Sequence, residues 1–149
     1  MLTQKIFTIG FTKKTAKEFF EMLEENGVQK VVDVRLNNRS QLAAFTKFPD
    51  IEFFLNRISG IEYVHDLNFA PDNDILNDYK KNFISWEEYV REFDLLMGER
   101  KIDEYILKNY FGAENICLLC SEPAPDNCHR RLVAEKIAAV LNNVEIIHL

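Results

Sequence analysis

The feature that most constrains the fold is a series of five short apolar runs that alternate with segments of helical pattern. The runs cover residues 6–9, 28–34, 61–65, 116–120 and 144–148, and they are rich in Ile, Val and Leu. Runs of this length and composition are typical of strands, and apolar residues recur at helical spacing between them. The alternation predicts an α/β fold with three layers, in which helices cover both faces of a mostly parallel, five-stranded sheet.

The order of the strands decides which polar residues meet. Parallel strands place their carboxyl ends at one edge of a sheet, and ligands bind there in open α/β folds. We favour the Rossmann-like order 3-2-1-4-5, numbered along the chain. This order is expected to bring together the ends of the first, second and fourth strands.

Length, charge and cysteine content narrow the class of protein. The 149 residues suggest a single domain spanning 1–149, and the net charge of −6 disfavours a nucleic-acid partner, which normally requires a basic surface. Three cysteines do not suggest a secreted disulfide framework, so we expect a cytoplasmic protein. We also expect no signal peptide and no membrane partner, because no apolar run reaches the roughly 18–20 residues that span a bilayer.

Residues 116–131, with the sequence ICLLCSEPAPDNCHRR, gather the most reactive side chains. An apolar strand ends at Cys120, a turn containing Pro123 and Pro125 follows, and Asp126 or Asn127 is a good N-cap for a helix opening at residues 128–130. A helix N-terminus favours anions and lowers the pKa of a nearby thiol. We therefore expect a site here that contains Cys120, Glu122, Cys128, His129 and Arg130.

Two other strand ends supply further candidates for ligand binding. Thr8 and Gly10 end the first run, and Asp33 and Arg35 end the second, where charges are costly unless paired. Arg35 and Arg130 are the best candidates for anion recognition, since planar guanidinium groups suit phosphate, sulfate or carboxylate.

Three signatures stand together in the chain: Thr8-Ile9-Gly10-Phe11-Thr12, Asp33-Val34-Arg35, and Cys120-Ser121-Glu122 with Cys128-His129-Arg130. This set resembles the domain of unknown function 488 family, and the match extends over most of the chain. The resemblance implies an α/β fold and a shared polar site, and it carries no established reaction.

The cysteines allow several interpretations. Cys120 or Cys128 is a candidate nucleophile, with His129 and Glu122 handling protons or orientation. Alternatively, both thiols are packed side chains, or oxidation joins them in a disulfide. Zinc is a third interpretation, but it usually takes four ligands, and the fourth would have to be Glu122, His65 or Asp33. We assign no metal ligands on this basis.

Other polar and aromatic residues have structural interpretations that we favour. Glu122 is expected to pair with Arg35 or Arg130, and Asp33 to orient a neighbour rather than act as a base. Trp86, Tyr89 and Phe93 lie at helical spacing, which is more typical of a core than of a ligand-stacking surface.

Our leading hypothesis is a small cytoplasmic enzyme, a cysteine-dependent transferase or hydrolase, that acts on an anionic small molecule. The ligand is expected to be phosphorylated or nucleotide-like, and the sequence identifies no cofactor. One alternative is a non-catalytic module that binds a nucleotide or a nucleic-acid end through the same pocket. Another is a structural metal site or a set of polar contacts that holds the loops.

Overall fold

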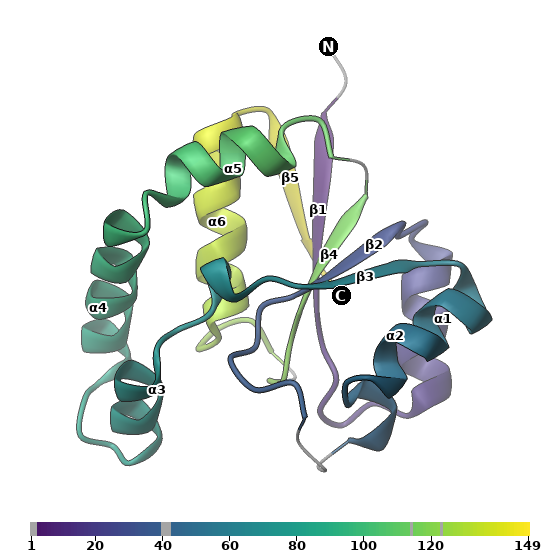
Figure 1. Cartoon of the computed structure of the whole chain (residues 1–149), viewed down its shortest axis with the longest axis horizontal. Coiled ribbons are helices and arrows are strands. Elements are labelled where there is room, and N and C mark those ends of the chain that lie inside the picture. The colour runs from purple at the N-terminus through teal and green to yellow at the C-terminus, as the bar shows by residue number, and fades with distance from the viewer. Residues whose placement is uncertain (1–2, 40–42, 114, 123) are drawn as a thin grey trace.

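The alternation of strands and helices predicted from the sequence is present in the computed structural model, which describes residues 3–39, 43–113, 115–122 and 124–149 (Figure 1). Pro123 of the predicted turn lies outside these residues. One sheet contains five strands, and every pair is parallel. The strands are β1 (Gln4–Gly10), β2 (Lys30–Asp33), β3 (Glu62–His65), β4 (Ile116–Cys120) and β5 (Val144–His148).

The predicted strand order was wrong in one exchange. The sheet has the order β3-β2-β4-β1-β5, so β4, and not β1, is the central strand. All five residues of β4 are buried, as suits a central strand, whereas the first two residues of β1 are not, and β1 pairs on its other side with the half-exposed edge strand β5. The exchange leaves β4 between β1 and β2, so the three strand ends still meet.

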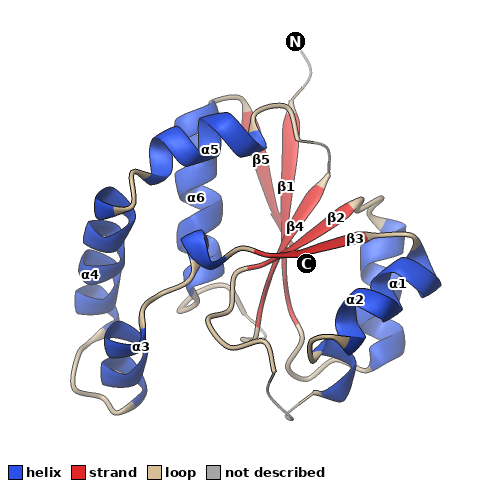
Figure 2. Ribbon diagram, in the orientation of Figure 1, coloured by secondary structure: helices blue, strands red, loops and turns tan. Residues whose placement is uncertain are grey.

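The helices lie on both faces of the sheet, as predicted. They are α1 (Ala16–Glu25), α2 (Asp50–Phe54), α3 (Asn73–Lys80), α4 (Trp86–Glu99), α5 (Ile102–Tyr110) and α6 (His129–Leu141). Figure 2 shows α1 and α2 beyond one face of the strands and α4, α5 and α6 beyond the other. Short single-turn segments cover Ala44–Thr46, Leu55–Ser59 and Leu67–Phe69.

Local capping signals fix two helix starts. Thr15 caps α1 and Ser85 caps α4, and each accepts a hydrogen bond from the backbone of a Glu three residues later while that Glu side chain accepts one from the cap residue. This reciprocal arrangement satisfies two backbone donors that a helix start otherwise leaves unpaired.

The alternation of side chains along β4 divides the core into two clusters. Cys117 and Leu119 pack with residues of α1 and α2, including Phe19, Leu23 and Ile51. Ile116, Leu118 and Cys120 pack with residues of α4, α5 and α6, including Phe93, Ile106 and Ile137. Both faces of the central strand are therefore covered, as expected for a parallel sheet.

The carboxyl ends of the three central strands are level with one another. In the parallel register Gly10 lies beside Cys120, and Asp33 lies beside Leu119. The candidate side chains from all three strands thus emerge at one edge. Within the described part of the chain, no helix has the length and apolar character needed to cross a membrane.

Candidate functional site

A buried ion pair closes the end of β2. The Arg35 guanidinium places Nη2 2.7 Å from Asp33 Oδ2 and Nε 2.8 Å from Oδ1, so the contact has two points. Burial opposes ionisation of Arg35, but the hydrogen bonds and charge of Asp33 outweigh it and raise the pKa of Arg35. The prediction that Asp33 orients a neighbour matches this geometry.

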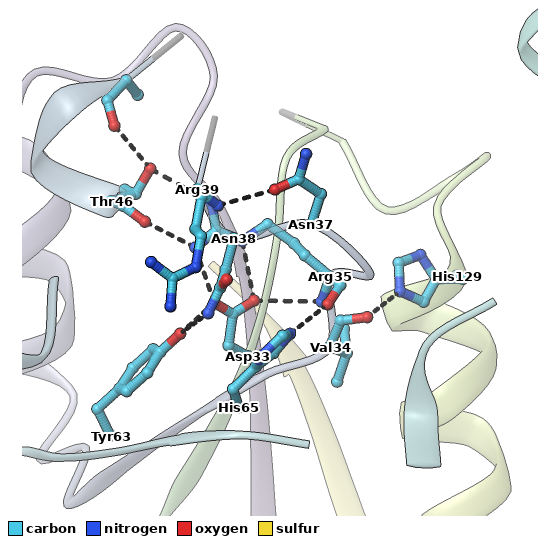
Figure 3. Close-up of polar contacts among 11 residues, drawn as sticks. Asp33, Val34, Arg35, Asn37, Asn38, Arg39, Thr46, Tyr63, His65 and His129 are labelled. Atoms are coloured by element: carbon cyan, nitrogen blue, oxygen red, sulfur yellow. Dashed lines mark hydrogen bonds and ion pairs between the residues drawn. The ribbon is translucent and has the colours of Figure 1, made fainter. Parts of the chain in front are cut away.

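Polar neighbours complete this ion pair (Figure 3). Tyr63 donates its hydroxyl to Asp33 Oδ2 at 2.6 Å, and the Thr46 carbonyl accepts from Arg35 Nη2 at 2.7 Å. His65 Nε2 lies 2.6 Å from the Arg35 carbonyl, and Asn38 donates to the Tyr63 hydroxyl at 3.0 Å. The guanidinium is therefore held in one orientation.

Cys120, Cys128 and His129 form a compact buried cluster beside this ion pair. One ligand atom from each side chain, two thiol Sγ atoms and a ring nitrogen, lie within 4.8 Å of one another. Cys120 Sγ is 3.6 Å from His129 Nδ1. Cys128, and not Asp126 or Asn127 as predicted, is the N-cap of α6, and its side chain makes no capping bond. The Cys128 thiol instead lies within 4.8 Å of the Cys120 thiol.

The backbone of β2 sets the tautomer of His129. Nε2 lies 2.6 Å from the Val34 carbonyl oxygen, which can only accept a hydrogen bond (Figure 3). Nε2 must therefore carry a proton, and in the corresponding neutral tautomer the lone pair of Nδ1 faces Cys120. Nδ1 is thus positioned to accept a proton or to bind an electrophile.

The two thiols at the site differ in acidity. A hydrogen bond from the Cys128 thiol lowers the pKa of Cys120, helped by the Ser121 backbone N–H and the Arg130 charge and opposed by burial. The same hydrogen bond, together with burial, raises the pKa of Cys128. Cys120 is therefore the thiol of the pair that ionises first.

Arg130 lies behind the cluster, in contact with the end of β1. The fully buried guanidinium donates from Nη1 to the Glu122 carbonyl at 2.6 Å and from Nε to Thr8 Oγ1 at 3.3 Å. A Cβ added to Gly10 would lie 1.6 Å from the same Glu122 carbonyl oxygen. Gly10 and Arg130 thus hold the backbone that follows Cys120.

A cavity of about 360 Å³ opens above the cluster. Arg35 and the segments 120–122 and 127–129 line it, and Lys80 contributes a second basic side chain. Tyr79 of α3 and Trp86 and Tyr89 of α4 form an aromatic wall, in which the Trp86 and Tyr89 rings stack with centroids 5.0 Å apart. The arrangement combines apolar surface, positive charge and a thiol.

The structure brings most of the candidate residues together. Cys120, Glu122, Cys128, His129 and Arg35 line the cavity, and Asp33 reaches it through Arg35. Thr8, Gly10 and Arg130 adjoin one another but are not among its lining residues. Glu122 contacts Arg130 through its carbonyl oxygen, while its side chain is exposed.

Sequence reasoning missed the aromatic wall and the residues that support the ion pair. Tyr89 is buried as expected of a core residue, but it and Trp86 also face the cavity. The only usable signal for the wall was the aromatic spacing on one helix face. Tyr63, Asn38 and Thr46 gave no signal, because their partners are distant in sequence.

Comparisons with known proteins identify one family. The sequence model of a family described as "Domain of unknown function DUF488" matches residues 15–137. No curated protein and no solved structure shows significant similarity to the chain.

Proposed function

The chain belongs to the DUF488 family, and we propose that it is a cysteine-dependent enzyme, a hydrolase or transferase, that acts on an anionic, nucleotide-like ligand in this cavity. The observation that carries the proposal is the position of Cys120 Sγ. Cys120 is one of the residues that line the cavity, its Sγ lies 3.6 Å from a ring nitrogen of His129, and the neighbouring Cys128 thiol lowers its pKa.

The proposed chemistry uses these two groups in sequence. Cys120 Sγ attacks the electrophilic carbon or phosphorus of the ligand, and the bond to the leaving group breaks. His129 Nδ1 takes the thiol proton and returns it to the leaving group. Water, or a second substrate in a transferase, then cleaves the bond to sulfur and restores the thiol.

The charges around the cavity support an anionic ligand. Arg35, whose charge is already paired with Asp33, and Lys80 both line the cavity, and so does Cys128 at the N-terminus of α6. Exposed donors at a helix N-terminus and basic side chains both favour negative charge. The net charge of the whole chain is negative, so the attraction is local to the cavity.

The aromatic wall supports a planar group on that ligand. Tyr79, Trp86 and Tyr89, on α3 and α4, contribute aromatic side chains to the lining of the same cavity. Stacking on such rings is tolerant of the identity of a base. A nucleotide, with a charged end and a flat end, fits both halves. We also propose a cytoplasmic location, since all three cysteines are free thiols.

The test is turnover of a panel of nucleotides and phosphate esters, followed by phosphorus NMR. At least one compound should be consumed by the wild type and by Cys117→Ala, but not by Cys120→Ser, because Cys117 is a buried thiol outside the cavity. Equal turnover with Cys120→Ser would disprove the role of the thiol.

A second pair of variants tests the site of binding. Lys80→Ala should weaken binding of the consumed compound, whereas Lys108→Ala, on α5 and outside the cavity lining, should not. The deep burial of Cys120, which is 6% exposed, favours a non-catalytic binding module as the second candidate. Binding that depends on Lys80, without turnover of any compound, would favour that module.

A further inference from the structure

Two thiols and one imidazole among the residues that line the cavity are arranged in a way that the proposed reaction does not require. Thiolates and imidazoles are ligands that Zn²⁺ prefers. Cys120 and Cys128 supply two thiols, and His129 supplies one imidazole. Their ligand atoms lie within 4.8 Å of one another, close enough to share one ion.

We propose that Cys120 Sγ, Cys128 Sγ and His129 Nδ1 bind one thiophilic divalent metal ion, Zn²⁺ in the first instance, with an open coordination position facing the cavity.

The measured separation fits this assignment. Zn–S bonds of about 2.3 Å and Zn–N bonds of about 2.0–2.1 Å place the sulfur and nitrogen of a tetrahedral site about 3.5 Å apart. Cys120 Sγ and His129 Nδ1 are 3.6 Å apart. An ion can therefore bind these two atoms without a large displacement of either side chain.

The tautomer of His129 also suits a metal ligand. Metal-binding histidines usually donate the proton of their second ring nitrogen to a carbonyl or carboxylate, which directs the other nitrogen at the ion. Here Nε2 lies 2.6 Å from the Val34 carbonyl, which leaves the lone pair of Nδ1 free to bind. The orientation is fixed by the backbone of β2 and needs no ion to create it.

Charge balance favours the ion as well. Binding a divalent cation releases the protons of Cys120 and Cys128, and the two thiolates then cancel its charge. A neutral assembly costs less to bury than a single thiolate, and each of the three residues is at most 7% exposed.

The three candidates for a fourth protein ligand either contact other groups or lie outside the cluster. Asp33 is paired with Arg35, and His65 Nε2 contacts the Arg35 carbonyl. The Glu122 side chain is exposed and does not belong to the cluster found among the described residues. Three protein ligands with a free fourth position are typical of catalytic or regulated zinc sites, whereas structural sites have four.

The metal-bound and metal-free states have different consequences for Cys120. As a ligand, its sulfur no longer attacks a substrate, so the ion would mask the nucleophile proposed above. The metal site does not depend on that reaction, and its test measures binding of the metal alone.

The experiment titrates reduced, chelator-treated protein with Zn²⁺ in competition with a chromophoric chelator. The wild type and Cys117→Ala should each bind one equivalent, and Cys120→Ser and Cys128→Ser should each lose affinity by more than the roughly 10–100-fold that outer-shell changes cost. Circular dichroism establishes that each variant is folded.

A second measurement needs no variant. Co²⁺ bound to the wild type should give thiolate-to-metal absorption that Zn²⁺ abolishes, and titration in buffers of different ionisation enthalpy should register the released protons. No Zn²⁺ binding by the wild type, or unchanged affinity in Cys120→Ser, would overturn the site. A wild-type protein that turns over a substrate but binds no Zn²⁺ would refute this proposal and leave the enzyme proposal intact.

Discussion

At the scale of single residues, Gly10 shows how closely two backbone segments approach at the site. It lies beside Cys120 in the register of β1 and β4, and the segment after Cys120 passes directly over it. Its role is thus to allow this approach, and its φ angle is not among the positive ones. The sequence showed a glycine at a strand end, but only the fold shows what passes over it.

We expect Gly10→Ala to destabilise the protein by about 1–3 kcal/mol or more, because an added Cβ collides with backbone that cannot move independently of Arg130. Gly98→Ala is the matched control: it lies within α4 and has nothing within 4 Å of an added Cβ. That change should stabilise the helix by about 0.5–1 kcal/mol. Urea unfolding measures both, and equal effects would contradict the close approach.

The buried ion pair leads to a second prediction. Asp33→Asn should destabilise the protein by about 3–5 kcal/mol, because it leaves the Arg35 guanidinium buried without a counter-charge. Tyr63→Phe removes one hydrogen bond to the same carboxylate and should cost about 1 kcal/mol. Chemical denaturation of both variants is the measurement, and a cost for Asp33→Asn no greater than that for Tyr63→Phe would argue against the pairing.

At the scale of elements, α4 links a local sequence signal to the cavity. The Ser85–Glu88 capping box fixes the first turn of α4, and Trp86 on that turn forms part of the aromatic wall. Thr15 and Glu18 form the same motif at the start of α1, on the other side of the sheet. The two caps are therefore matched in chemistry and differ in position.

Ser85→Ala and Thr15→Ala should each cost about 1 kcal/mol of stability. Only Ser85→Ala should also increase iodide quenching of Trp86, the single tryptophan of the chain, because fraying of that turn exposes the indole. Fluorescence quenching under native conditions tests this difference. A similar increase in Thr15→Ala would show that the effect is global.

Comparing the predicted helices and strands with the observed ones shows which predictions the sequence patterns could support. The bounds of β4 and β5 were predicted correctly, because each depends on neighbouring residues. The run at 28–34 became the shorter strand β2. Val28 bonds back to Leu23 before the strand begins, and after Asp33 the chain turns to return Arg35 to that carboxylate. The N-cap of α6 and the central position of β4 were missed, since both are decided by contacts between distant segments. Periodicity also could not separate a cavity wall from a core, because both require an apolar helix face.

At the scale of the whole molecule, four tyrosines are expected to make the free energy of unfolding depend on pH. Burial raises the pKa values of Tyr63, Tyr89, Tyr105 and Tyr110. Hydrogen bonds add to this effect for three of them, because Tyr63 donates to Asp33 and both Tyr105 and Tyr110 donate to Asp66. For Tyr105 the pKa rises to about 12. The fold therefore favours the protonated phenols.

The free energy of unfolding should keep its full value below the ordinary tyrosine pKa of about 10. It should fall as the pH rises toward the higher tyrosine pKa values of the folded protein. Tyr105→Phe has no phenol to ionise, so its stability should fall less steeply than that of the wild type between about pH 10 and pH 12. Urea midpoints at several alkaline pH values measure the two slopes. Identical slopes would show that Tyr105 ionises equally in the folded and unfolded chain.

The central position of β4 has a consequence for amide hydrogen exchange. Because β4 pairs with β2 and β1 on its two sides, its amides should exchange only when most of the sheet opens. Tyr79 and Trp86 belong to α3 and α4, which lie farthest from the strands in Figure 1 and can open at a lower free energy. The aromatic wall of the cavity is thus expected to open more often than the strand that holds Cys120, which should exchange slowest.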